Sequence, residues 1–123
     1  MDHKQAATEF LRLASSGEVA RAYDTFVATN FKHHNAYFAG DASSLRKGME
    51  EAHQKMPNRS IEVARALEDG DLVAVHSRVT RQDPTAPEIA VVHIFRFEGD
   101  RIAELWDVGQ ELPKESPNKN GPF

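Results

Sequence analysis

The sequence predicts an α+β domain in which three N-terminal helices pack against a strongly bent, mainly antiparallel sheet that forms a cone-shaped barrel. The first observation behind this prediction is a change of period. Apolar residues recur every three to four positions before Pro57 and every second position after it. The second is a set of turn signals that divides the later part of the chain into hairpins. Helices followed by hairpins are typical of folds whose helices cover one face of a sheet. The mouth of such a cone is a natural pocket.

The first two helices have clear end signals. Asp2 can accept hydrogen bonds from the first-turn amides, and Gln5 follows at the spacing of a capping box. Gly17 ends the first helix, because glycine adopts the left-handed conformation at little cost. The second helix is short, with an apolar face that runs from Val19 to Val27.

A loop with a short extended piece is expected over residues 29–35, where neither period persists. The third helix follows. Asp41 and the two serines after it can cap its start, and Pro57 ends it because proline disfavours helical geometry in the preceding residue. The helical spacing is set by four apolar residues, Leu45, Met49, Ala52 and Met56.

Strand patterns fill most of the remaining sequence. The four predicted strands are residues 59–67, Leu72–Arg81, Glu88–Phe97 and Ile102–Val108. Asp69-Gly70 and Gly99-Asp100 are two-residue turn signals, and Asp83–Pro87 is a loop. Gly109-Gln110 is expected to close the last strand. The sequence therefore predicts one domain over residues 1–110 and an extended tail over residues 111–123.

The composition excludes several classes of partner. The 123 residues include 15 Lys+Arg and 19 Asp+Glu, which gives a net charge of −4. Nucleic-acid binders need a clustered basic surface, so we expect no nucleic-acid partner. We also expect no membrane contact and a cytoplasmic location, because the sequence has no apolar run of about 18 residues and no apolar segment after its charged start.

The residue types present limit the chemistry. The chain has no cysteine, six histidines and one tryptophan, so catalysis would depend on carboxylate and imidazole groups. The absence of a glycine-rich phosphate loop and of an H-E-x-x-H motif gives no support to a nucleotide or zinc-protease function. His33 and His34 are adjacent, which makes it difficult for both to bind one ion, and no carboxylate follows at ligand spacing. We therefore expect neither a metal nor a cofactor.

The last two predicted strands are apolar on both faces. Helices would cover one face of the sheet and leave an apolar surface on the other. Exposed patches of that size usually meet a partner. The simplest expectation is a homodimer formed through the outer face of the sheet.

Three polar residues interrupt otherwise apolar strands. Asp107 follows Trp106, the only tryptophan, while His93 and His76 lie within two earlier strands. A carboxylate among apolar residues loses hydration, which suits general acid/base chemistry, and a nearby imidazole can orient it or polarise a substrate carbonyl. Each also has a structural explanation: Asp107 as a turn partner, His93 as a core or interface histidine, and His76 as part of a polar lining or rim. Trp106 can likewise be a core or dimer-packing aromatic.

The pairing of the last two strands decides whether His93 and Asp107 share a face. A simple two-residue turn at Gly99-Asp100 pairs His93 with Trp106 and directs Asp107 to the other face. A longer loop with a bulge pairs His93 directly with Asp107, and bulges are frequent beside active sites. The sequence leaves both pairings open.

The last hairpin and the tail resemble a known family. Val91–Glu98 and Ile102–Val108 resemble the final hairpin of SnoaL-like polyketide cyclases, members of the nuclear-transport-factor-2-like (NTF2-like) superfamily. The tail, Pro113–Phe123, is similar to the ending of a bacterial subgroup predicted to be SnoaL-like aldol-condensation enzymes. The resemblance implies an NTF2-like, or cystatin-like, fold.

The resemblance also implies roles for individual residues. Asp107 would be the general acid/base and His93 its assisting histidine. His34-Asn35 and His76 match polar positions of the subgroup and would line the pocket, which Trp106 would help to shape. Many relatives have a histidine immediately before the Trp-Asp pair, whereas this chain has Leu105, so the pocket would be more apolar.

Three functional hypotheses follow. The first is a cofactor-independent lyase or isomerase, such as an aldol-type cyclase, in which Asp107 takes a proton next to the carbonyl of a small compound. The second is a non-catalytic homodimer that binds a small ligand in the same pocket. The third is water addition to an epoxide, which needs Asp107 to be paired with another carboxylate or with an asparagine such as Asn35.

Overall fold

The computed structural model of the protein describes residues 1–81, 83 and 85–123. It confirms the α+β class, with three helices and one five-stranded mixed sheet in the order β1-β5-β4-β3-β2. All neighbouring strands are antiparallel except β1 and β5, which are parallel. The elements in chain order are α1 (His3–Ser15), α2 (Val19–Phe26), β1 (Val27–His33), α3 (Ala42–Lys55), β2 (Arg59–Asp69), β3 (Leu72–Arg81), β4 (Ile89–Glu98) and β5 (Arg101–Glu111).

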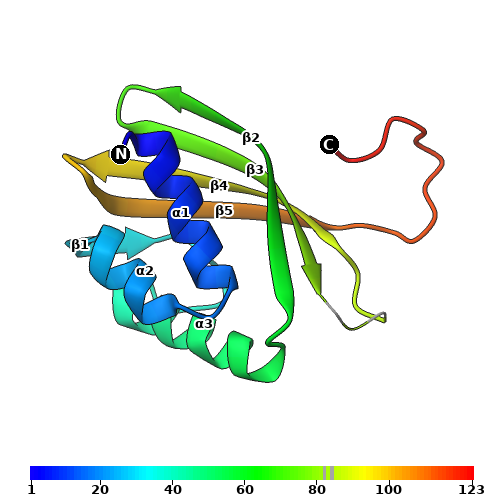
Figure 1. Ribbon diagram of the computed structural model, residues 1–123, viewed down its shortest axis with the longest axis horizontal. Helices are drawn as coiled ribbons and strands as arrows, with labels where there is room; N and C mark the ends of the chain where they lie inside the picture. The colour runs from blue at the N-terminus through cyan, green and yellow to red at the C-terminus, as the bar shows by residue number, and fades with distance from the viewer. Residues whose placement is uncertain (82, 84) are drawn as a thin grey trace.

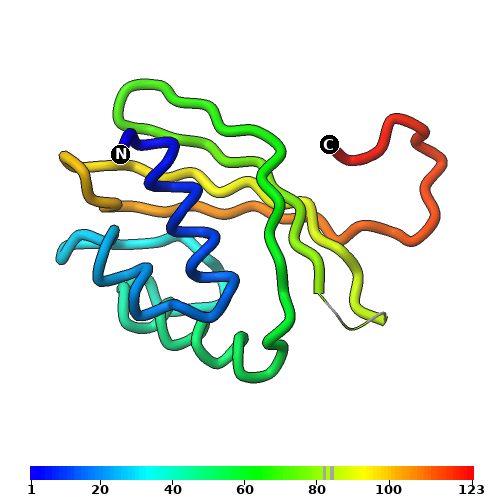
Figure 2. The backbone as a smooth tube through the Cα atoms, viewed as in Figure 1, coloured from blue at the N-terminus to red at the C-terminus, as the bar shows by residue number. Residues whose placement is uncertain are grey.

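The three helices lie on one face of the sheet, and α1 runs across it (Figure 1). β2 bends sharply along its length (Figure 2), and its pairing with β3 shifts by one residue between Val63 and Arg65. A bulge of this kind bends a strand and increases its twist. The bend carries the first part of β2 around the helices, so the helix-covered face of the sheet is concave. We call this the inner face and the opposite one the outer face.

The predicted helix ends are confirmed. Asp2 accepts a hydrogen bond from the amide of Gln5 at 2.7 Å, and the Gln5 side chain accepts one from the amide of Asp2 at 2.9 Å, which completes the capping box. Asp41 caps α3 by accepting from the amide of Ser44 at 3.1 Å. α3 ends at Lys55, two residues before the proline that was expected to stop it.

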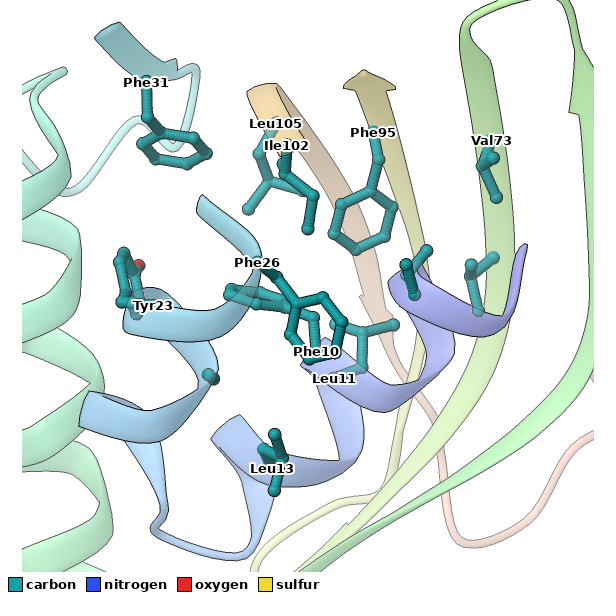
Figure 3. Close-up of a cluster of buried hydrophobic side chains, with 14 of the residues drawn as sticks. Phe10, Leu11, Leu13, Tyr23, Phe26, Phe31, Val73, Phe95, Ile102 and Leu105 are labelled. Atoms are coloured by element: carbon teal, nitrogen blue, oxygen red, sulfur yellow. The ribbon is translucent and has the colours of Figure 1, made fainter. Parts of the chain in front are cut away.

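Aromatic side chains join the helices to the inner face of the sheet. Phe10 of α1 and Phe95 of β4 are fully buried, and their rings meet edge to face with centroids 5.9 Å apart. Figure 3 shows Phe10 among side chains from α2 and the sheet. Burying an aromatic ring of this size contributes roughly 1.5–3 kcal/mol. The largest fully buried side chains are Phe10, Phe95, Ile102, Leu105, Val19, Val73 and Val75.

The segment expected to be mostly loop forms a strand instead. Residues 27–33 are β1, which pairs with β5 at the edge of the sheet, and its burial alternates so that Phe31 and His33 face the core. The apolar alternation in this segment is short and polar residues interrupt it, so tertiary pairing rather than local pattern determines the strand.

Two turn predictions also need correction. The turn between β2 and β3 is at Gly70-Asp71, one residue later than predicted, because Asp69 pairs with Leu72. Gly109-Gln110 does not close β5, since both residues pair with β4 and the strand continues to Glu111. The predicted loop Asp83–Pro87 lies partly outside the described residues.

Within the described part of the chain, no helix combines the length and the apolar character that crossing a membrane requires.

Gly17 allows a close approach between α1 and α3. It has a φ of +94° and completes the α1 terminus, where the Glu18 amide donates to the carbonyl of Leu13 at 2.9 Å. A Cβ at Gly17 would lie 2.3 Å from Nε2 of His53. Gly70 also has a positive φ, of +61°, but a Cβ there would meet nothing within 4 Å.

We therefore expect Gly70→Ala to lower the free energy of unfolding by about 1 kcal/mol through backbone strain alone. Gly17→Ala should cost more, because it adds the steric conflict with His53. Urea denaturation measures both. His53→Ala in the Gly17→Ala background should recover the difference between the two variants, and equal effects of Gly17→Ala and Gly70→Ala would contradict the proposed close approach.

Candidate functional site

A β-bulge in the last hairpin sets the orientation of the candidate site. The Gly99-Asp100 turn has two residues, and Phe97 pairs with Ile102 as a simple turn requires. Ala103 then has no partner, and Arg96 pairs with Glu104. From that point the register is displaced by one residue, and it brings Asp107 directly opposite His93. Of the two pairings that the sequence left open, the bulged one is therefore observed, with the bulge in β5 rather than in a longer loop.

Asp107 and His93 lie on the inner face. Leu105, two residues before Asp107, is only 1% exposed and belongs to the core cluster. Alternate residues of a strand point to the same face, so Asp107 points toward the helices as well. His93 lines a cavity together with residues of α1 and α3, which places its ring on the same side.

Asn35 holds the carboxylate of Asp107. Its Nδ2 donates to both carboxylate oxygens, at 3.0 and 3.2 Å. The Asn35 Oδ1 accepts from the amide of Tyr37 at 3.0 Å, which fixes the amide group with its nitrogen toward Asp107. The carboxylate therefore has a defined position and orientation without a paired cation.

His33 organises the loop that carries Asn35, a role that the sequence analysis missed. The side chain is 5% exposed. Its Nδ1 accepts from the amide of Asn35 at 3.1 Å, and its Nε2 donates to the carbonyl of Ala39 at 2.6 Å. Both ring nitrogens are thus satisfied in one neutral tautomer. The sequence indicated a loop near residues 29–35, but nothing in it indicated that His33 would hold this loop in place.

Burial keeps His93 neutral. Its Nδ1 is buried and has no hydrogen-bond partner among the described residues, and its ring stacks on Phe95 with centroids 6.2 Å apart. Burial lowers the pKa of His93 from 6.5 to about 4, and the negative charge of Asp107 opposes this shift without reversing it. Near neutral pH the imidazole is therefore a neutral donor and acceptor.

The cavity beside His93 has a volume of about 120 Å³. An apolar cavity of about 150 Å³ can hold benzene, so this one suits a compound of comparable or smaller size. Asp107 adjoins it through His93, its direct cross-strand neighbour. The lining residues are Leu11, Ala14, Ser15, Met49, Arg59, Ile61, Val79 and His93.

Three predicted pocket residues lie on the outer face instead. Trp106 precedes Asp107 in the strand and therefore points the opposite way, and His34 stacks on it with ring centroids 5.0 Å apart. His76 pairs with Val92 and contacts the side chain of Arg65, also on the outer side. The structure thus brings only Asp107, His93 and Asn35 together, and the sequence could not assign faces without the positions of the bulges.

Glu104 forms a second polar cluster, on the outer face. It is 8% exposed and contacts Nε2 of His34 at 2.5 Å and Nε of Arg96 at 2.9 Å. The hydrogen bond from His34 lowers the pKa of Glu104, and Arg96 adds to this effect. The cluster connects the loop that follows β1 to β5 and β4. It lies on the face of β5 opposite to Asp107. In the residues that the structure describes, no three His, Cys, Asp or Glu side chains are grouped as metal ligands.

Comparison with known families gives one match. The family model for the SnoaL-like domain matches residues 7–105, a range that ends two residues before Asp107. A comparison with curated proteins finds no match.

Solved structures share the fold at low sequence identity. An uncharacterised cystatin-fold protein from Novosphingobium aromaticivorans superposes with a TM-score of 0.73 and 19% identity, over 88% of this chain and 98% of that one. An NTF2-like protein of unknown function from Cytophaga hutchinsonii has a TM-score of 0.70 and 16% identity, over 89% and 91% of the two chains. A protein named "putative polyketide cyclase" from Bacillus cereus has a TM-score of 0.74 and 20% identity, over 85% and 71%.

The lowered pKa of His93 predicts a pH dependence of stability. Below about pH 6.5 the unfolded chain binds a proton at this residue, whereas the folded protein stays neutral there until about pH 4. As the pH is lowered from about 6.5 to about 4, the free energy of unfolding should therefore fall by ~3 kcal/mol in total. Urea denaturation between these pH values, with NMR titration of the ring, measures the effect. His93→Asn should remove most of this slope, and parallel pH profiles for the two proteins would contradict the assignment.

Proposed function

The chain belongs to the SnoaL-like domain family, and we propose on that basis that it is a cofactor-independent lyase or isomerase for a small carbonyl compound. Asp107 is the general acid/base in this proposal. The observation that carries it is a carboxylate on the inner face that is held by Asn35 and lies directly opposite a neutral, buried histidine. A shared fold does not determine a reaction, so the proposal depends on this arrangement.

The proposed reaction begins with proton transfer. Asp107 takes the proton from the carbon next to the substrate carbonyl, and the electron pair of the broken C–H bond moves into the carbonyl group to form an enolate. The neutral ring of His93 donates a hydrogen bond to the enolate oxygen, as neutral imidazoles do in other enzymes that form enolates. Asp107 then returns the proton to a different carbon, which isomerises the substrate. In an aldol reaction the enolate carbon instead bonds to a second carbonyl carbon, whose oxygen gains a proton.

The cavity supports a small substrate. At about 120 Å³ it is well below the roughly 300–1,000 Å³ typical of pockets for drug-sized ligands. The apolar side chains of Leu11, Ile61 and Val79 line it, so they would exclude water from the enolate. We therefore assign the substrate to compact carbonyl compounds rather than to polycyclic ones.

Two alternatives use the same cavity. In the first, the protein binds a small ligand without catalysis, which is compatible with the family and with the small, mostly apolar cavity. In the second, Asp107 activates water for addition to an epoxide. The bond from Asn35 to Asp107 favours this second alternative, since a carboxylate paired with an asparagine was its requirement.

The first test is Asp107→Asn. We expect deuterium exchange next to the carbonyl of small ketones in D₂O, followed by NMR, to fall by about 10²–10⁴-fold, because the variant lacks the base. Asp100→Asn, in the exposed turn of the same hairpin, is the matched control and should retain full exchange.

Unchanged exchange in Asp107→Asn would refute the catalytic role. Thermal stabilisation by a ketone that persists in Asp107→Asn, without exchange in either protein, would identify the non-catalytic binder. Incorporation of ¹⁸O from labelled water into a diol product would instead identify epoxide hydrolysis.

We also propose that the protein forms a homodimer through the outer face of the sheet. Val108 is 71% exposed there, and Leu72 is 38% exposed, although both are large apolar side chains. Val92 pairs with Val108, and Ile94 pairs with Trp106, so the apolar surface spans β4 and β5. Contiguous apolar surface of this kind usually marks a protein interface.

Val108→Glu should therefore shift the protein from dimer to monomer in light scattering coupled to gel filtration, because it would bury a charge in the interface. Tyr37→Glu is the matched control, since Tyr37 is 90% exposed but lies in the loop after β1. A wild-type protein that is monomeric at about 100 µM, well above a micromolar dissociation constant, would contradict the proposal.

A further inference from the structure

Two arginines face each other at the end of the β2–β3 hairpin farthest from its turn. Arg59 and Arg81 are directly opposite in the antiparallel pairing. The pairs that follow along the same face, Ile61 with Val79 and Val63 with Ser77, point toward the helices. Like charges directly opposite one another destabilise a sheet, so this pair needs an explanation beyond folding.

Neither arginine is paired with a carboxylate in the described salt bridges. Several other arginines of the sheet and helices have carboxylate partners: Arg78 contacts Glu88 at 2.9 Å, Arg96 contacts Glu104 at 2.9 Å, and Arg46 contacts Asp24 at 3.3 Å. Arg81 donates from Nη2 to the carbonyl of Pro87 at 2.7 Å.

Burial increases the cost of this arrangement. The Nε atoms of Arg59 and Arg81 are both buried and have no hydrogen-bond partner among the described residues. Burial lowers the pKa of Arg59, and the charge of Arg81 lowers it further. Asp83 is an opposing charge that interacts with Arg81, but the pKa of Asp83 is lowered mainly by hydrogen bonds from Thr85, and Arg81 is the last of its causes. The pair therefore retains an unneutralised positive charge.

The arginine pair borders the cavity of the candidate site through Arg59, whereas Arg81 is not among the lining residues. Arg59 lines the cavity together with His93. Between them on the inner face lies Ser77, which is fully buried and whose Oγ has no partner among the described residues. Unsatisfied buried polar groups are rare in native proteins, and two of them, on Arg59 and His93, belong to residues that line this one cavity. They indicate that a polar ligand completes the site.

We propose that the cavity binds a keto acid, whose carboxylate is bound by Arg59, with the charge of Arg81 next to it, and whose carbonyl lies beside His93. The guanidinium group is planar and offers parallel donors that match a carboxylate. The bound anion would reduce the repulsion between the two arginines. The placement of the ligand carbonyl beside His93 rests on the proposed function, whereas the placement of its carboxylate does not.

Charge also determines the direction in which the ligand binds. Asp107 lies at the His93 end of the site and repels a carboxylate, while the arginine pair at the other end attracts it. Only one orientation satisfies both constraints, and it places the carbon next to the carbonyl near the base. The arginines are thus proposed to determine substrate specificity and orientation, not to take part in proton transfer.

The test compares levulinate, a keto acid, with methyl levulinate, its neutral ester. Isothermal titration calorimetry on the wild-type protein should give at least a tenfold lower dissociation constant for the acid, roughly the value of one charge-assisted contact. Arg59→Gln and Arg81→Gln should each remove this preference. Arg65→Gln is the matched control, because Arg65 is on the same strand but on the outer face, and it should retain the preference.

A second measurement guards against misfolded variants. Because each substitution removes a like-charge repulsion, the Tm of ligand-free Arg59→Gln and Arg81→Gln should be no lower than that of the wild type. Levulinate should raise the Tm of the wild type but not of these variants. Stable variants that still prefer the acid, equal binding of acid and ester by the wild type, or no binding of either would overturn the proposal.

Asp107→Asn separates this inference from the proposed function. It should bind levulinate at least as tightly as the wild type, since a repulsive charge is removed. Acid binding that depends on Arg59, together with an absence of deuterium exchange in the wild type, would reject the catalytic function and retain the anion site. Deuterium exchange that depends on Asp107, with no preference for the acid, would retain the catalytic function and reject the anion site.

Discussion

The unpaired residue Ala103 determines which side chains of β5 point into the core and which lie at the candidate site. In an uninterrupted ladder after the Gly99-Asp100 turn, the parity of every later residue in β5 would be reversed. Glu104 and Trp106 would then point into the core and Asp107 would point away from it. With the bulge, Leu105 fills the interior while Asp107 faces the helices and Glu104 meets cations on the other side. Core packing and the candidate chemistry therefore have one common structural cause.

The interior of the protein has two parts with different composition. One end, around Phe10 and Phe95, is apolar and closely packed, and its polar backbone groups are satisfied within helices and strands. The other end contains His93, Ser77 and Arg59, each with a buried polar atom that has no partner among the described residues. A buried polar atom without a partner costs about 1–3 kcal/mol, so this end weakens the fold that the first end stabilises. Such local conflicts with the rules of folding are expected at functional sites.

The sequence predicted those features that depend on neighbouring residues. The capping box at Asp2, the helix stop at Gly17 and the hairpin at Gly99-Asp100 all involve contacts within a few positions, and the structure contains each of them. The strand register and the face to which each side chain points were harder to predict, because they depend on how many residues separate a side chain from the preceding turn. The bulges in β2 and β5 each displace the pairing by one residue, and neither has a distinct local signal. For this reason the sequence left open whether His93 shares a face with Asp107, and it placed His34, His76 and Trp106 at a pocket, whereas they lie on the outer face.

The outward position of Trp106 also makes it a natural optical probe. It is the only tryptophan in the chain, so the near-ultraviolet emission of the protein comes mainly from one site. That indole lies flat against the ring of His34, with an angle of 4° between the two planes, and next to the apolar surface of β4 and β5. Its fluorescence will therefore respond to coverage of the outer face, whereas a ligand in the cavity would lie on the opposite side of the sheet. Emission spectra can thus report on the proposed subunit association independently of ligand binding.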